Sequence, residues 1–279
     1  MDIVYSNRSI VGNTLVECAF FDYNKPVVIC FNPAGKLLSE KQLHSGAHAW
    51  GFKFISSLGI NVVAINTLSL NHWFLCSEFE EYVPKLAVLL KRFPERLGYG
   101  ASMGAFAVTY YAGQLNINRA LLYSPLQPPK RDHNFDFTEC HSTHWSIIYD
   151  PFNEEDKAIA HLYPAQSHYL HFYGVGHQVI ESIAKIKYLK PLFLQFYAGQ
   201  IADVEFYKQQ TKKRTLIRYY SYMDRNPTKK NTFKRKAIIK KNKLLFILRN
   251  SDLLYKQVAN RISKSIQKRI NKIIEERSL

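Results

Sequence analysis

Continuous apolar runs alternate with segments of helical periodicity along most of the chain. The runs have the length and composition of strands buried on both faces, and they lie at residues 26–31, 61–66, 120–124, 145–149 and 169–173. Residues 46–58 and 79–93 place apolar side chains at helical spacing between such runs. Residues 1–24 are typical of a hairpin with its turn at Gly12-Asn13. The alternation predicts an α/β fold with a mostly parallel sheet flanked by helices, whose ligands bind at the carboxyl ends of the strands.

One motif follows a strand-like segment and precedes a helix-compatible run at 105–112: Gly100-x-Ser102-x-Gly104. A serine at the tip of a sharp strand-to-helix turn needs neighbours without side chains two positions away, because the backbones pass close together there. Such a turn exposes the serine hydroxyl at the carboxyl edge of the sheet. It also points the Met103 amide and the start of the helix at negative charge that develops beside the serine. The motif therefore predicts a nucleophile.

Serine is a weak nucleophile at neutral pH, so it needs a neighbouring base, and the base needs an acid that holds its tautomer. His177 is the candidate base, because it follows the run at 169–173 in a glycine-containing loop, a placement that no other histidine after Ser102 has. Two aspartates follow the run before it. Asp156 is preferred as the acid, because it lies a few residues beyond its strand at the start of a predicted helix. Asp150, directly at the strand end, is the alternative.

The chain order Ser102, Asp156, His177, with each residue after its own strand, resembles the α/β-hydrolase superfamily. The resemblance extends over roughly residues 25–200, and the motif around Ser102 is its most specific part. It implies a catalytic triad of these three residues. It also implies an oxyanion hole that combines the Met103 amide with an amide from the loop after the first apolar run.

That loop departs from the pattern of the superfamily, because Asn32-Pro33 stands where a His-Gly pair is common. Proline has no N–H to donate, so Ala34 is the predicted second donor of the oxyanion hole. The polar segment 127–143 is too short to form a lid domain. The sequence therefore predicts a site without a large lid, open to a bulky, polar substrate.

Positive charge is concentrated in the last part of the chain. The protein has 279 residues and a formal net charge of +16, and residues 205–279 hold 22 of its 38 Lys and Arg but 5 of its 22 Asp and Glu. This division predicts a catalytic domain at 1–204 and a basic, mainly helical C-terminal extension at 205–279. Within the extension, apolar residues fall on one helical stripe from Leu253 to Ile274.

The extension has three competing interpretations. It could lie on an anionic membrane surface, bind a polyanion such as an acidic polysaccharide or nucleic acid, or pack on the catalytic domain or on a second subunit of a homo-oligomer. Specific nucleic-acid binding is not expected, because the positive charge belongs to the extension alone.

Little in the sequence indicates export, disulfides or metal. The four cysteines are widely spaced without a C-x-x-C pair, the amino terminus lacks a signal-type pattern, and no apolar run approaches the roughly 18 residues that cross a membrane. These features predict a cytoplasmic protein, with a peripheral position at the inner face of the membrane if the extension binds lipid. Histidine pairs such as His44 and His48 lack a third ligand at a recognisable spacing, so no metal and no resident cofactor are predicted.

Three functions are consistent with these residues. The first is a serine esterase that acts on a small-molecule or glycan ester, with a polar or carbohydrate-linked acyl group. The second is an O-acyltransferase that uses the same triad to move an acetyl group from acetyl-CoA to a polysaccharide hydroxyl. The third is a non-catalytic module in which a degenerate hydrolase fold anchors the basic extension to a membrane or polyanion, and it requires a broken triad.

Overall fold

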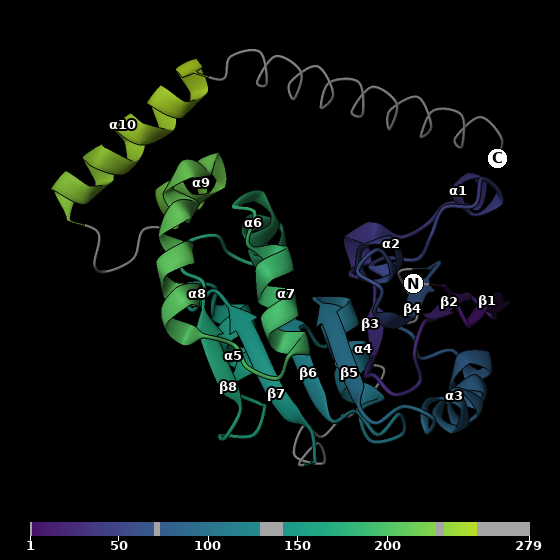
Figure 1. The fold of residues 1–279 in the computed structure, drawn as a ribbon. Coiled ribbons are helices and arrows are strands. Elements are labelled where there is room, and N and C mark those ends of the chain that lie inside the picture. The colour runs from purple at the N-terminus through teal and green to yellow at the C-terminus, as the bar shows by residue number, and fades with distance from the viewer. Residues whose placement is uncertain (1, 70–72, 129–141, 227–231, 250–279) are drawn as a thin grey trace, which may run out of the picture. The chain divides into compact units, whose positions relative to one another are not determined.

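The computed structural model describes residues 2–69, 73–128, 142–226 and 232–249 (Figure 1). The chain divides into two compact units, Met1–Lys213 and Arg214–Leu279. The first unit continues past the predicted boundary at 204/205, because it includes helix α8 (Asp203–Gln210). The Phe206 ring of α8 is fully buried, and its centroid lies 6.2 Å from that of Phe172. This contact ties α8 to the end of the sheet.

Within the described residues, eight strands of the first unit form one sheet, in the order β1-β2-β4-β3-β5-β6-β7-β8. Strand β2 is antiparallel to both of its neighbours, and all later neighbours are parallel. The mostly parallel sheet expected from the apolar runs is confirmed. The strands are β1 (Tyr5–Val11), β2 (Thr14–Phe20), β3 (Val27–Phe31), β4 (Asn61–Thr67), β5 (Arg96–Ala101), β6 (Arg119–Tyr123), β7 (His144–Tyr149) and β8 (His168–His171).

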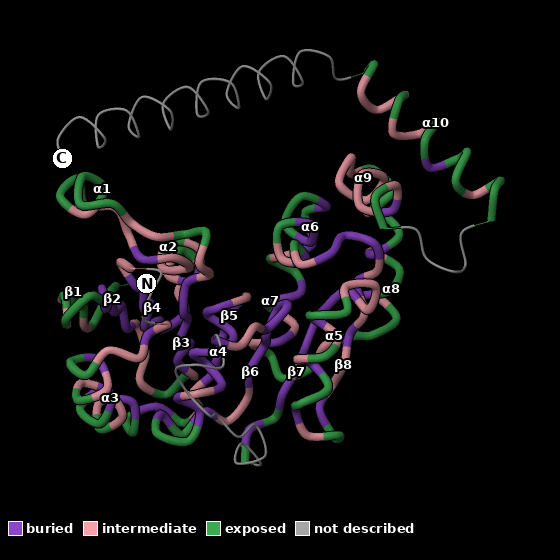
Figure 2. Tube along the Cα trace, turned by 180° about the vertical axis from the view of Figure 1, so that it is seen from behind, coloured by how far each residue is buried: buried purple, intermediate pink, exposed green. Residues whose placement is uncertain are grey.

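Helices cover both faces of the sheet, and β5 shows why. A Cβ on Gly98 would lie 2.5 Å from Val108 Cγ1, so the missing side chain lets α4 (Met103–Tyr110) pack closely on that face. On the other face, the Tyr99 ring stacks on Trp50, just before α2 (Phe52–Ser56), and meets a phenylalanine of α7 (Leu189–Tyr197) edge to face. Figure 2 shows the central strands buried between these layers. Further described helices are α1 (Glu40–His44), α3 (Ser77–Leu90), α5 (Glu154–Ala160) and α6 (Val179–Lys185), with 3-10 turns η1 (Ala34–Lys36) and η3 (Thr211–Thr215).

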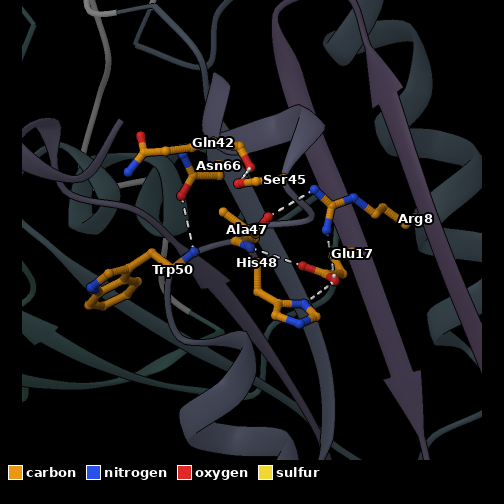
Figure 3. A network of polar contacts seen from close by, with 9 residues as sticks. Arg8, Glu17, Gln42, Ser45, Ala47, His48, Trp50 and Asn66 are labelled. Carbon is orange, nitrogen blue, oxygen red and sulfur yellow. Dashed lines mark hydrogen bonds and ion pairs between the residues drawn. The ribbon is translucent and has the colours of Figure 1, made fainter. Parts of the chain in front are cut away.

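The helix expected over 46–58 is much shorter, because the segment before it is held by side chains of distant strands (Figure 3). The buried Glu17 carboxylate of β2 accepts the Ala49 N–H at 2.9 Å, and Asn66 Oδ1 of β4 accepts the Trp50 N–H at 3.0 Å. Amides bonded in this way do not donate to helical carbonyls. Gly51 then has φ +84°, a left-handed conformation, and the helix begins after it.

In the second unit the structure describes α9 (Ile217–Arg225) and α10 (Phe233–Arg249). Met223 and Ile239 are buried between these two helices, and Lys243 forms an ion pair with Asp224. The stripe expected from Leu253 to Ile274 lies outside the described residues, as do residues 129–141 of the polar segment for which no lid is predicted. Among the helices of the described ranges, none combines the length and apolarity needed to cross a membrane.

Candidate active site

Ser102 lies at the tip of a sharp turn between β5 and α4, with φ 55° and ψ −122°. The backbone of a residue that carries a side chain is strained in this conformation, so the surrounding contacts must hold Ser102 there. A Cβ on Gly100 would lie 2.5 Å from the Gly104 carbonyl oxygen, and a Cβ on Gly104 would lie 2.2 Å from the Phe31 carbonyl oxygen. Both glycines are therefore steric requirements of the turn, as the motif predicts.

The three residues expected from the sequence form one chain of hydrogen bonds. Ser102 Oγ lies 2.9 Å from His177 Nε2, and His177 Nδ1 lies 2.7 Å from Asp156 Oδ1. Asp156 is in the first turn of α5 and is fully buried, and Asn153 Nδ2 also donates to its Oδ1 at 2.9 Å. Because a carboxylate accepts hydrogen bonds, Nδ1 carries the proton of a neutral His177, which leaves Nε2 to accept the Ser102 O–H.

Asp150, the alternative acid, contacts the loop that carries His177 instead of the imidazole. Its Oδ2 accepts the three successive amides of residues 174–176 at 2.6–2.9 Å, and its Oδ1 accepts the Phe152 N–H at 3.0 Å. Burial raises the pKa of Asp150, and the four N–H donors oppose that rise. Of the two aspartates, Asp156 is therefore the one placed against the histidine ring, while Asp150 positions the loop.

No protein-family model matches this sequence, and no curated protein matches it. The chain is similar to a solved structure of the Glycosylation Associate Protein (Gap123) complex from Streptococcus agalactiae, with 14% identity and a TM-score of 0.50 over 68% of this chain and 46% of that one. It thus spans less than half the length of that streptococcal chain.

Two further similarities are weaker. The capsule O-acetyltransferase of Neisseria meningitidis serogroup A has 11% identity and a TM-score of 0.47, over 71% of this chain and 96% of that one. An alpha/beta superfamily hydrolase from Oenococcus oeni has 10% identity and a TM-score of 0.42, over 69% and 99% of the two chains.

The arrangement of the site on the sheet identifies the fold. Ser102 follows β5 in the middle of the parallel strands, Asp156 follows β7, and His177 follows β8 at the edge. Nucleophile, acid and histidine come in this order on the superfamily's sheet, with the serine on a strained strand-to-helix turn. The chain has the α/β-hydrolase fold.

In this α/β-hydrolase fold, a cavity of about 150 Å³ opens beside Ser102. Charged and polar side chains from η1 and α6 stand at its border. Its lining residues are Pro33, Gly35, Lys36, Ala101, Ser102, Tyr123, His177, Gln178, Ile180 and Glu181. The two amides expected to stabilise an oxyanion belong to Ala34 and Met103, which are not among these residues, although both of Ala34's neighbours are. Their role stays a prediction.

The start of the loop after β3 is held by a residue that no sequence motif assigns to the site. Asn32 is fully buried, its Oδ1 accepts the Thr67 N–H at 2.8 Å, and its Nδ2 donates to the Pro33 carbonyl at 3.1 Å. An asparagine directly after an apolar strand was the available signal. Asn32 therefore fixes the peptide that precedes Ala34, at the position where the superfamily commonly has a histidine.

The environment of His177 favours its charged form. Burial lowers the pKa of the imidazole, but the hydrogen bond and charge of Asp156, with smaller contributions from Glu155 and Glu181, outweigh it, and the pKa is raised above 6.5. Within the part of the chain that is described, Asp156 Oδ2 is buried without a hydrogen-bond donor. The negative charge of this carboxylate is therefore available to stabilise an imidazolium.

A consequence is a defined pH dependence of turnover. If His177 acts as the base, it must be neutral to accept a proton, so kcat/KM for a non-ionising ester should rise with pH to a plateau, with its midpoint above 6.5. Because the folded-state pKa is raised, the same group stabilises the fold at low pH and loses that contribution as pH rises through this pKa. Asp156→Asn should move the midpoint downwards, and an unchanged midpoint would contradict the assigned cause.

The Ala34 amide can be removed with little disturbance of the backbone. Ala34 is the first residue of η1, and Pro33 before it is extended with ψ 156°, which is the conformation preferred before proline. We expect Ala34→Pro to lower kcat for a short ester by about 10²–10³-fold, because a proline cannot donate to the oxyanion. Ala34→Gly keeps the N–H and should retain most of the activity. Equal rates in the two variants would place the second donor elsewhere.

Proposed function

We propose that the protein is a serine esterase that works through an acyl-enzyme on Ser102. The observation that carries the proposal is the continuous hydrogen-bonded chain from Ser102 Oγ through His177 to the buried Asp156. This arrangement activates an alcohol that is otherwise a weak nucleophile. The 2.9 Å contact between serine and imidazole also counts against the non-catalytic alternative, which requires a broken triad.

In the proposed mechanism Ser102 Oγ attacks the ester carbonyl carbon while His177 Nε2 takes the hydroxyl proton. The tetrahedral intermediate carries negative charge on the former carbonyl oxygen. When the intermediate collapses, the C–O bond to the leaving alcohol breaks and His177 returns the proton to that alcohol. Water then attacks the acyl-enzyme, gives a proton to His177, and releases the carboxylic acid as the proton returns to Ser102.

Backbone amides would stabilise the tetrahedral oxyanion. As the first residue of α4, Met103 has an amide without an acceptor inside its own helix, and the helix start favours negative charge. Ala34, as the first residue of η1, is the proposed second donor. Amides held by the backbone need no reorganisation when charge develops, which is why such donors lower the barrier effectively.

The cavity supports a short acyl group attached to a polar alcohol. A volume of about 150 Å³ suits a group about as large as benzene, so a short acyl group fits inside it. Lys36, Gln178 and Glu181 at its border can hydrogen-bond a polar leaving group such as a sugar. We therefore propose a small acyl ester of a polar or carbohydrate alcohol as the substrate.

Hydrolysis and acyl transfer share the acyl-enzyme and differ only in the group that attacks it. The His177 side chain is 36% exposed, so water can reach the base, and this favours hydrolysis. A sugar hydroxyl in place of water, with acetyl-CoA as the acyl donor, would make the protein an O-acyltransferase. Product analysis with acetyl-CoA and candidate glycans distinguishes the two, since transfer forms a new sugar ester and hydrolysis forms acetate alone.

The decisive experiment is covalent labelling of the full chain. A fluorophosphonate probe should modify the protein, and peptide mass spectrometry should locate the adduct on Ser102. A short p-nitrophenyl ester should show a burst of one equivalent followed by steady turnover if deacylation is slower than acylation. An unlabelled Ser102 together with no turnover would overturn the proposed function.

A further inference from the structure

Helix α10 carries an exposed apolar strip, which we define as Phe233, Ala237, Leu244 and Leu248. At 100° per residue these four side chains fall within about 60° of one another around the helix axis. Phe233 is 89% exposed, Leu244 56% and Leu248 64%, and Ala237 is exposed as well. A row of large apolar side chains in contact with water is unfavourable unless a partner covers it.

The strip does not face α9. The contacts between the two helices involve another side of α10, where Ile239 is 4% exposed and Lys243 pairs with Asp224. Around the helix axis, Ile239 lies about 150° and Lys243 about 110° from the middle of the strip. Among the described residues of the second unit, the packing of α9 on α10 therefore leaves the strip uncovered.

Lysines border the strip on both sides. Lys236 and Lys240 lie along one edge and Lys234 and Lys241 along the other, and from Phe233 to Arg249 the helix contains no acidic residue. An apolar strip between two rows of cations is the pattern of a helix that lies in the plane of a membrane interface. The lysine side chains can keep their charge among the head groups while their stems cover apolar surface.

We propose that α10 docks on the surface of an anionic lipid bilayer, with the strip in the boundary between head groups and acyl chains. The opposite charges of lysines and anionic lipids attract the helix, and burial of the strip holds it. A polyanion would satisfy the lysines but leave the strip exposed to water. A second copy of α10 laid strip to strip would bring the rows of lysines together, which like-charge repulsion opposes.

The test is co-sedimentation of the full chain with vesicles. Vesicles of phosphatidylcholine containing about 30 mol% phosphatidylglycerol should bind the protein at least about tenfold more tightly than vesicles of phosphatidylcholine alone. The double variant Phe233→Ser/Leu248→Ser should bind the anionic vesicles at least about tenfold more weakly than the wild type, although its charge is unchanged. Circular dichroism and ester turnover check that this variant is folded.

Ile238→Ser is the matched control, because Ile238 is 49% exposed on the same helix but lies outside the strip. This variant should bind vesicles as the wild type does. Absence of vesicle binding by the wild type would overturn the proposal, and so would equal loss in the control and the double variant. Retention of heparin binding with no vesicle binding would indicate a polyanion, and a dimer lost in the double variant without vesicle binding would indicate self-association.

Discussion

Ser102→Ala is expected to lower kcat for a short ester by about 10⁶-fold and to abolish labelling by a fluorophosphonate. The reason is that the alanine has no oxygen to attack the carbonyl, while His177 and Asp156 cannot act without a nucleophile. The turn itself should persist, since the Ser102 N–H donates to the Tyr123 carbonyl at 2.9 Å through the backbone, and alanine keeps the Cβ. Steady-state kinetics and thermal unfolding measure the two quantities separately.

Ser57→Ala supplies the control for this prediction. Ser57 is an exposed serine whose hydroxyl donates to the Phe54 carbonyl at 2.9 Å, and it lies outside the residues that line the cavity. This variant should keep wild-type turnover and labelling. If Ser102→Ala retained either property, another nucleophile would have to be responsible.

The second large effect is expected at Asp156. Asp156→Asn should reduce kcat by about 10⁴-fold, because an amide can hold the wrong tautomer of His177 and no longer offsets the charge of the imidazolium. The substitution hardly changes the volume of the side chain, so the free energy of unfolding should change little beyond the weakening of the two hydrogen bonds that Oδ1 accepts from His177 and Asn153. Measuring both kcat and the free energy of unfolding of this variant therefore separates an effect on catalysis from an effect on folding.

Asp150→Asn should lose more stability and less activity than Asp156→Asn. Its carboxylate accepts four backbone N–H groups, and an asparagine must turn its own NH₂ towards at least one of them. We expect the free energy of unfolding to fall by about 1.5–3 kcal/mol, with a smaller loss of kcat than in Asp156→Asn. If instead Asp150→Asn lost kcat without losing stability while Asp156→Asn stayed active, the roles given to these two residues would be wrong.

Most of the fold follows from local sequence patterns, since a strand buried on both faces must be apolar throughout. The run at Val27–Phe31 and the Gly100-x-Ser102-x-Gly104 motif are of this kind, because each requirement is met by adjacent residues. The order of Ser102, Asp156 and His177 then follows from which strand each residue succeeds. These features could be predicted without knowledge of any distant contact.

Other features depend on contacts that the sequence does not display. Asp150 and Asp156 both follow β7, and the sequence alone does not tell which of them meets the imidazole. In the structure the amides of residues 174–176 donate to Asp150, and Asp156 is the aspartate that contacts His177. The shortened α2 has the same origin, because Glu17 and Asn66 reach Ala49 and Trp50 from other strands. In each case a buried polar side chain satisfies backbone amides far away in sequence, which overrides local helix propensity.

The closeness of Gly104 to the Phe31 carbonyl has a consequence for how this scaffold could acquire new specificity. At a Cβ-to-oxygen distance of 2.2 Å no side chain fits at Gly104, so the turn that carries Ser102 packs directly against the end of β3. Adaptation to another alcohol is then expected from other side chains that line the cavity, such as Lys36, Gln178 and Glu181. Mutagenesis libraries aimed at altered selectivity should diversify those three positions and leave the glycines untouched.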